Sequence, residues 1–157
     1  MKEIEICGGA KAQVDDDDYD RLVKIKWYLC CGYAVNRSRG ANGVIKWTRM
    51  HRVVNNTPDG MYTDHIDGNK LNNQKENLRT CTKRQNNMNK TKNNNKTGYK
   101  GVWYEQKSGK YMATITINRK QRTIGRFKTK EAAAIAYNKA ALQLHGEFAH
   151  LNVLKEA

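Results

Sequence analysis

The sequence has few residues of several types, and it lacks the features that define three classes of protein. It has one proline and two phenylalanines in 157 residues. No apolar run approaches the roughly 20 residues that a membrane-spanning helix needs. The four cysteines do not form two closely spaced pairs, so they do not predict a structural zinc site. The N-terminal MKEIEICGG lacks the apolar core of a secretion signal. We therefore expect an intracellular protein with reduced thiols and no membrane partner.

Acidic residues are the scarcer charged type. Lys and Arg number 29 against 15 Asp and Glu, a formal net charge of +14, and the excess is greatest in residues 95–157. A basic surface of this kind mainly neutralises a polyanion. We expect double-stranded DNA as the partner and no small-molecule substrate. The length allows one ordinary domain or a few very small ones.

The first fifty residues contain ordinary secondary-structure signals. Residues 15–28 begin with four consecutive acids, which favour a helix N-terminus, and predict a short helix. The runs 33–37 and 44–54 are rich in β-forming residues around a loop that contains Gly and Asn, and they predict a hairpin. These elements either support the segment that follows or contact DNA themselves.

The central segment TDHIDGNKLNNQKENLRTCTKRQNN, residues 63–87, combines metal ligands with a proton acceptor. An Asp64 carboxylate and an Asn amide supply the hard oxygens that Mg²⁺ prefers. His65 is the only side chain in the segment that accepts a proton near neutral pH. Neighbours on a strand point to opposite faces, so Asp64 and His65 share one site only if the chain bends there. The alternative is a surface loop rich in Asx residues, with no catalytic role.

Beyond a polar, asparagine-rich stretch at 88–98, the pattern predicts a small sheet with one helix. Residues 110–117 alternate as a half-buried strand, with partners at 122–127 and 101–104. A helix then begins at the N-cap Thr129 and ends at Gly146. The helix would cover one face and leave the face with Lys and Thr open to a DNA major groove.

TDHIDGNKLNNQKENLR, continued by TCTKRQN, resembles the HNH motif of phage and intron-encoded homing endonucleases, over about residues 50–90. The resemblance implies a ββα-metal fold and DNA cleavage. It implies that Asp64 and Asn86 hold one Mg²⁺ or Mn²⁺, and that His65 is the general base. The Asn that orients the histidine is Asn77 or Asn73.

Four further residues near the motif are candidates for a role at the site. His51 is either a buried histidine that packs under the site or a catalytic contributor, and Arg52 and Arg79 are candidate phosphate contacts. Asn87 replaces Asn86 if the helix register differs by one. We expect a monomer, which with one such site would nick one strand. Its expected location is the cytoplasm of a bacterial host or phage-infected cell.

The motifs YKGV, GKY, IGRF, EAAAIAYNKAAL and HLN resemble the plant ethylene-response-factor (AP-two type) DNA-binding domain, over about residues 97–152. The corresponding DNA contacts are Lys100, Trp103, Glu105, Thr114, Thr116 and Thr123. The plant pattern has mostly Arg and Trp at these positions, so the plant target sequence is not expected. Phosphate contacts are assigned to Lys100, Lys107, Lys110, Arg119, Lys120 and Arg122.

Together these observations predict an α+β protein. A helix and hairpin at 1–50 support an HNH nuclease core at 51–92, and a linker at 93–97 leads to a DNA-binding domain at 98–152. The predicted activity is metal-dependent hydrolysis of DNA, with site choice aided by the C-terminal domain. The alternative functions are a non-catalytic, sequence-specific DNA-binding regulator, or an Asp-His-Asn set that merely holds together a loop-rich domain.

Overall fold

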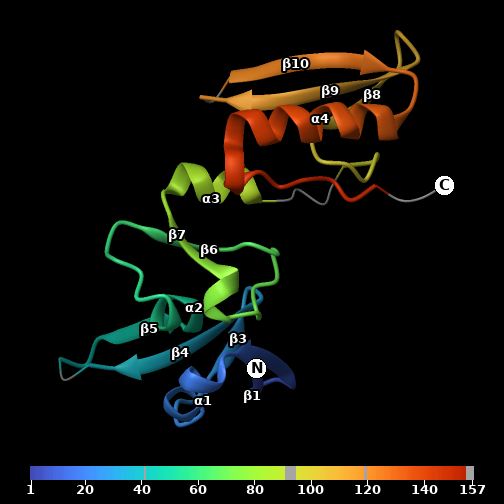
Figure 1. Ribbon diagram of the computed structural model, residues 1–157. Coiled ribbons are helices and arrows are strands. Elements are labelled where there is room, and N and C mark those ends of the chain that lie inside the picture. The colour runs from blue at the N-terminus through green and yellow to red at the C-terminus, as the bar shows by residue number, and fades with distance from the viewer. Residues whose placement is uncertain (41, 91–94, 119, 155–157) are drawn as a thin grey trace. The chain divides into compact units, whose positions relative to one another are not determined.

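The protein is described by a computed structural model that covers residues 1–40, 42–90, 95–118 and 120–154. It divides into two compact units, Met1–Asn86 and Asn87–Ala157 (Figure 1). Both units mix small antiparallel sheets with helices, as the predicted α+β class requires. Among the described residues, no helix is long and apolar enough to cross a membrane.

Within its described residues, the first unit contains three small antiparallel sheets and three α-helices. In chain order its elements are β1 (Lys2–Ile6), β2 (Ala10–Val14), α1 (Asp16–Leu22), β3 (Tyr28–Cys30), β4 (Tyr33–Arg39), β5 (Ile45–Arg49), α2 (Met50–Val54), β6 (Tyr62–His65), the 3₁₀ helix η1 (Lys75–Asn77), β7 (Leu78–Cys81) and α3 (Lys83–Asn89), which crosses the boundary between the units. The sheets pair β1 with β2, β3 with β4 and β5, and β6 with β7.

The core of this unit is built from alternate residues of the first hairpin and from the segment after it. Ile4, Ile6, Ala12 and Val14 are buried on one side of β1 and β2. Trp27 is 2% exposed, and its indole Nε1 donates a hydrogen bond to the Leu22 carbonyl at 2.8 Å. This bond satisfies the only polar atom of a large buried side chain, so Trp27 joins the core without an unpaired donor.

Two sequence predictions in this region meet different outcomes. The acidic residues do begin a helix, but α1 ends at Leu22 rather than continuing to residue 28. The strand predicted over 44–54 is wrong beyond Arg49, because Met50–Val54 forms α2. Met50, His51 and Val54 are buried. A spacing of one and four residues puts them on one side of a helix but on both sides of a strand. Their burial therefore favours the helix.

The second unit is a three-stranded antiparallel sheet covered by one long helix (Figure 1). Its elements are β8 (Val102–Glu105), β9 (Lys110–Ile117), β10 (Lys120–Phe127), α4 (Lys130–His145) and the 3₁₀ helix η2 (Gly146–Phe148), with strand order β10-β9-β8. The predicted caps are confirmed, since Thr129 Oγ1 accepts a hydrogen bond from the Ala132 amide at 3.1 Å and the helix ends at Gly146.

One glycine lets α4 lie close to the sheet. Gly101 has a φ of 75°, and a Cβ atom placed there would lie 2.3 Å from the ring of Tyr137 and 2.6 Å from the Thr114 carbonyl oxygen. Only glycine accepts both the left-handed backbone and this contact. Tyr137 is 4% exposed and packs with Ile115 and Ala141.

The predicted linker at 93–97 falls partly outside the described residues, which omit 93 and 94. The described part belongs to the second unit. Asn95 Nδ2 donates to the carbonyls of Tyr99 and Val102, at 2.7 and 2.6 Å, and Thr97 Oγ1 donates to Val102 at 2.9 Å. Asn95 and Thr97 therefore anchor the start of β8.

Candidate active site and nucleic-acid interface

The central motif lies on the two-stranded sheet of β6 and β7. Asp64 pairs with Arg79 and His65 with Leu78, and both motif residues are only 5% exposed. Side chains of neighbouring strand residues point to opposite faces, so Asp64 and His65 begin from different sides of β6. Gly68 donates a hydrogen bond to the His65 carbonyl at 3.0 Å, so the chain turns directly after the histidine. The IDGN sequence thus forms a turn, which lies after His65 rather than between Asp64 and His65.

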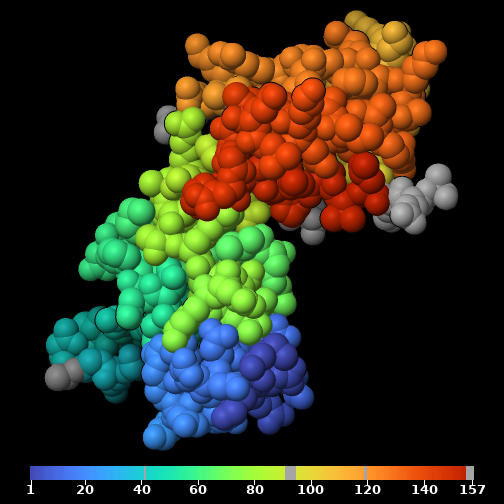
Figure 2. All heavy atoms as spheres, in the orientation of Figure 1, coloured from blue at the N-terminus to red at the C-terminus, as the bar shows by residue number. Residues whose placement is uncertain are grey.

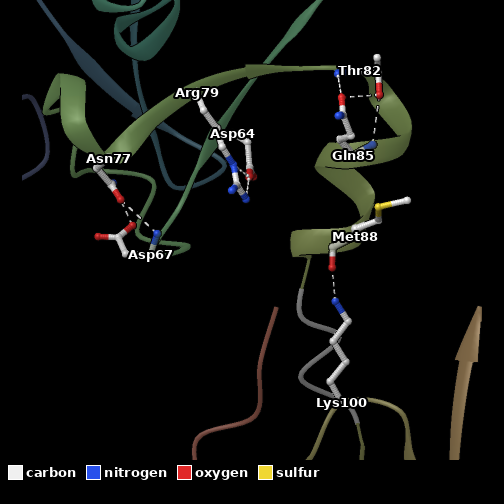
Figure 3. A network of polar contacts seen from close by, with 8 residues as sticks. All are labelled: Asp64, Asp67, Asn77, Arg79, Thr82, Gln85, Met88 and Lys100. Atoms are coloured by element: carbon white, nitrogen blue, oxygen red, sulfur yellow. Dashed lines mark hydrogen bonds and ion pairs between the residues drawn. The ribbon is translucent and has the colours of Figure 1, made fainter. Parts of the chain in front are cut away.

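Asp64 forms a buried ion pair with Arg79 (Figure 3). Arg79 Nε and Nη2 lie 3.0 and 2.7 Å from Asp64 Oδ2. Both side chains are mostly buried, at 6% and 13% exposure, where loss of solvent strengthens the attraction. Arg79, which the sequence suggests as a phosphate contact, is therefore placed against the candidate metal ligand.

The helix that carries Asn86 begins with a capping box. Thr82 Oγ1 accepts from the Gln85 amide at 3.3 Å, and Gln85 Oε1 accepts from the Thr82 amide at 2.8 Å (Figure 3). The Asn86 amide then donates to the Thr82 carbonyl at 3.0 Å. The sequence TKRQ thus places Asn86 in the first turn of α3.

The thiol of Cys81 lies near both the Asp64 carboxylate and the Asn86 backbone. Burial and the nearby Asp64 carboxylate raise the pKa of the Cys81 thiol, while a hydrogen bond with the Asn86 backbone lowers it. Cys81 and Arg79 are two residues apart on β7 and so share a face. Cys81 therefore lies on the Asp64 side of the sheet, shortly before α3 begins. The fallback Asn87 is exposed, and its Oδ1 accepts from Lys90 Nζ at 2.9 Å.

The oxygen atoms of Asp64 and Asn86 suit a hard divalent cation, which takes one or two protein oxygens and fills its other positions with water and phosphate. Among the described residues, no cluster of three His, Cys, Asp or Glu side chains could hold a metal. One carboxylate and one amide remain a chemically fitting pair for Mg²⁺ or Mn²⁺.

His65 is held as a neutral imidazole. Burial lowers its pKa, and the Asn73 hydrogen bond and the carboxylates of Asp67 and Asp64 oppose this only in part. Asn73 Oδ1 lies 3.4 Å from His65 Nε2, and Asn73 Nδ2 donates to the Leu71 carbonyl at 3.1 Å. The second bond orients the amide, so that Nε2 donates to Asn73. This tautomer puts the ring's lone pair on Nδ1.

His51 packs directly against His65. Their ring centroids are 5.0 Å apart at 84°, and Tyr33 lies 5.2 Å from His51 and 6.1 Å from His65. Burial and the neighbouring His65 lower the pKa of His51 to about 3. A histidine with so low a pKa stays neutral and is a poor proton acceptor at physiological pH. The edge-to-face contact places the His51 ring directly against the ring of His65.

Asn77 closes the loop between β6 and β7 rather than contacting His65. Its Nδ2 donates to Asp67 Oδ1 at 2.9 Å, and its Oδ1 accepts from the Asp67 amide at 3.0 Å (Figure 3). Nδ2 also donates to the Asn72 carbonyl at 2.9 Å. Of the two asparagines left open by the sequence, the structure brings only Asn73 to the His65 ring. The spacing of residues in the sequence carries no signal that distinguishes them.

Arg52 also has internal partners. Its Nη1 donates to the Met61 carbonyl at 2.8 Å, and its Nη2 lies 3.2 Å from the carbonyls of Thr57 and Pro58. These bonds tie α2 to the loop before β6. Arg52 thus holds the strand that carries Asp64 and His65.

In the second unit, the sheet face away from α4 carries most of the predicted base contacts. Thr116 and Trp103 are exposed there, whereas Thr114 is only 4% exposed. Thr114 Oγ1 accepts from Trp103 Nε1 at 3.2 Å and from Gln121 Nε2 at 2.9 Å. Thr114 therefore orients two larger side chains on this face.

The register of β10 places its polar residues on both faces of the sheet. Gln121, Thr123 and Arg126 pair with Thr116, Thr114 and Met112 and share their face, which makes Gln121 and Arg126 candidates that the family pattern misses. Arg122 and Lys120 pair with Ile115 and Ile117, whose side chains pack toward α4. The β-bulge between Thr123 and Gly125 shifts the register, so Arg126 could not have been placed by alternation alone.

The remaining predicted phosphate contacts divide into three groups. Lys107 and Lys110 are exposed at the β8–β9 turn. Lys100 is half-buried, and its Nζ donates to the Met88 carbonyl (Figure 3). Burial lowers the pKa of Lys100 to about 8. Arg119 lies outside the described residues.

Glu105, at a predicted DNA-contact position, forms a 2.8 Å ion pair with Arg126, and this contact lowers the pKa of Glu105 to about 2.

Comparison with known proteins agrees with this division. Residues 55–88 match the family model described as HNH endonuclease, and residues 97–147 match the AP2 domain. A protein of Acanthamoeba polyphaga mimivirus, named as an uncharacterized HNH endonuclease, is 36% identical over 145 residues, or 92% of this chain and 75% of that protein. Protein 3.8 of Escherichia phage T7 is 37% identical over 93 residues, or 59% of this chain and 76% of that protein. No solved structure shows significant similarity.

The family matches cover the two segments in which the sequence motifs lie, and the mimivirus relative extends over nearly the whole chain. The second unit carries the match to a DNA-binding domain, so DNA is the partner of the protein. The chain therefore belongs to the HNH endonucleases and combines an HNH nuclease segment with a C-terminal AP2 domain.

Proposed function

We propose that the protein hydrolyses phosphodiester bonds of double-stranded DNA with one divalent metal ion, and that β6, β7 and α3 form its ββα-metal core. The observation that supports this most is the burial of Asp64 and His65 on β6, which pairs with β7, the strand that leads into α3. That helix carries Asn86. Buried polar residues in a small unit are costly unless they are paired or used.

In this proposal Asp64 and Asn86 hold Mg²⁺, with Mn²⁺ as a substitute. The ion would stabilise charge that develops on the phosphate and the leaving oxygen. Asp64 provides the charged ligand, and Asn86 provides a neutral oxygen from α3. Arg79 keeps the Asp64 carboxylate in place through its two contacts.

His65 is proposed to take the proton from the attacking water. Its burial keeps the imidazole neutral, and the Asn73 contact directs the proton-free nitrogen to Nδ1. Asn73 and His51 are positioning residues: Asn73 sets the ring tautomer, and His51 limits rotation of the ring by edge-to-face packing. The expected products are 5′-phosphate and 3′-hydroxyl ends, as in related HNH enzymes.

The AP2 unit is proposed to bind DNA through the sheet face that carries Trp103, Thr116 and Thr123, with Lys107 and Lys110 on phosphates. Linking it to the nuclease raises the local concentration of DNA at the active site. Since the positions on this face differ from the plant pattern, a different target sequence is expected. A monomer with one site would nick one strand.

One observation favours a second function, a DNA-binding regulator without nuclease activity. The ion pair with Arg79 already neutralises the Asp64 carboxylate. In an inert protein this pair would serve only to hold β6 and β7 together.

Supercoiled plasmid incubated with the protein and Mg²⁺ decides between these functions. Wild type should produce nicked circles, EDTA should stop the reaction, and Mn²⁺ should restore it. Asp64→Ala, His65→Ala and Asn86→Ala should each lose nicking while they still bind DNA. Circular dichroism of each variant controls for folding. Equal behaviour of wild type and all three variants would show that the nuclease assignment is wrong.

A further inference from the structure

The hairpin of β4 and β5 belongs to a long stretch without negative charge. No Asp or Glu occurs between Asp20 and Asp59. The same stretch contains Arg21, Lys24, Lys26, Arg37, Arg39, Lys46, Arg49 and Arg52. A solvated surface of a small protein usually mixes charges of both signs. A hairpin region with cations alone attracts a polyanion.

The register of the hairpin puts most of its cations on one face. Arg37 pairs with Trp47, Arg39 with Ile45, and Val35 with Arg49. Cross-strand partners share a face, as do alternate residues along each strand. Arg37, Arg39, Trp47 and Arg49 therefore lie together, and we call these four residues the hairpin strip. Lys46 pairs with Ser38 on the opposite face.

The hairpin strip is open to solvent and includes an aromatic ring. Trp47 is 59% exposed, and the Arg37 guanidinium carbon lies 6.0 Å from its ring. Figure 2 shows the hairpin projecting from the rest of the first unit. An exposed tryptophan beside arginines is unusual for a surface that contacts only water. Such a ring can pack on the sugar of a nucleotide while the arginines bind phosphates.

The strip continues to the candidate active site. The Arg49 guanidinium carbon lies 5.2 Å from the Tyr33 ring, and Lys70 Nζ lies 4.5 Å from the same ring. Tyr33 in turn contacts the rings of His51 and His65. All of these residues belong to the first unit. A path of positive charge therefore runs from the hairpin to the histidine.

We propose that the hairpin strip is a DNA-binding surface, which holds the phosphate backbone of the duplex beside the bond to be cut. This inference rests on the proposed function of His65 for the position of that bond. Binding itself depends only on the strip. The β4–β5 hairpin lies within the first fifty residues, whose role the sequence leaves open, and it thereby becomes part of the DNA-binding surface of the nuclease unit.

A matched pair of single substitutions tests the proposal in the full-length protein. Arg37→Gln and Lys46→Gln each remove one positive charge from the same hairpin, but from opposite faces. Binding to a fluorescein-labelled duplex is measured by anisotropy in EDTA over a range of salt concentrations. Removing one phosphate contact should lower the slope of log K against log salt by about 0.9. We expect this change, with a weakening of about three- to tenfold, for Arg37→Gln alone.

Trp47→Ala should weaken binding by about fivefold with the salt slope unchanged, since it removes a contact that carries no charge. Arg37→Lys should restore the wild-type slope. Equal effects of Arg37→Gln and Lys46→Gln, or no effect of either, would overturn the proposal. Because these measurements contain no metal, they stay informative if the plasmid assay finds no nicking. If the wild-type protein does not nick the plasmid but the binding results are as expected, the proposed nuclease activity is refuted and the proposed binding surface stands.

Discussion

The most exacting prediction concerns Gly101, which sits where α4 meets the sheet of the AP2 unit. In Gly101→Ala, the added methyl would lie 2.3 Å from two carbons of the Tyr137 ring and 2.6 Å from a backbone oxygen. Tyr137 is buried, so its ring has little room to move. Overpacking of a filled core costs about 1–3 kcal/mol, and the left-handed backbone adds about 1–2 kcal/mol. We expect a loss of about 2–5 kcal/mol in the free energy of unfolding.

Gly98 provides the matched control. Its φ is 76°, nearly that of Gly101, but a Cβ atom there meets no atom within 4 Å. Gly98→Ala should therefore carry only the backbone cost, about 1–2 kcal/mol. The difference between the two variants isolates the contact with Tyr137.

Urea unfolding of both variants, with hydrogen exchange of β8–β10 to identify the affected unit, measures this difference. Gly101→Ala should also weaken DNA binding while nicking by the first unit persists. Equal losses in the two variants would refute the packing argument, because the tight contact would then have no energetic effect. Loss of protection in β1–β5 would show that the two units do not unfold separately.

Three other perturbations test the site and the division of labour. The pKa of His51 is about 3 in the folded protein against 6.5 in the unfolded chain, so between these pH values only the unfolded chain binds this proton. As pH drops from 6.5 to about 3, the free energy of unfolding should fall by about 1.4 kcal/mol per pH unit more than it does in His51→Gln. Parallel plots of unfolding free energy against pH for the two proteins would contradict this. Asn73→Ala should lower the nicking rate about tenfold, because it removes the hydrogen bond that positions the His65 ring, whereas Asn77→Ala should mainly lower the melting temperature. Identical effects of the two variants on the nicking rate would show that Asn73 does not position His65. Deletion of residues 96–157 should weaken DNA binding, make it less dependent on salt and loosen the choice of cleavage site, while some metal-dependent nicking is retained. Unchanged affinity and an unchanged cut site would contradict the proposal that the AP2 unit holds the nuclease on its DNA.

Local patterns in the sequence were enough to predict much of the AP2 unit. The alternation over 110–117, the Thr129 cap and the stop at Gly146 each depend on interactions between residues near in sequence, and the structure confirms them. The strand predicted through residue 54 failed because burial of Met50, His51 and Val54 on one side depends on the core around them. Local β propensity cannot report such burial.

The candidate site shows the same boundary between local and tertiary information. The Asp-His motif and the distant Asn86 are visible in the sequence, because their residue types and spacing carry the family resemblance. The choice of Asn73 as the neighbour of His65, the ion pair between Asp64 and Arg79, and the single-faced strip of Arg37, Arg39, Trp47 and Arg49 are not. Each depends on strand register and loop closure, which bring together side chains whose distances no linear spacing determines.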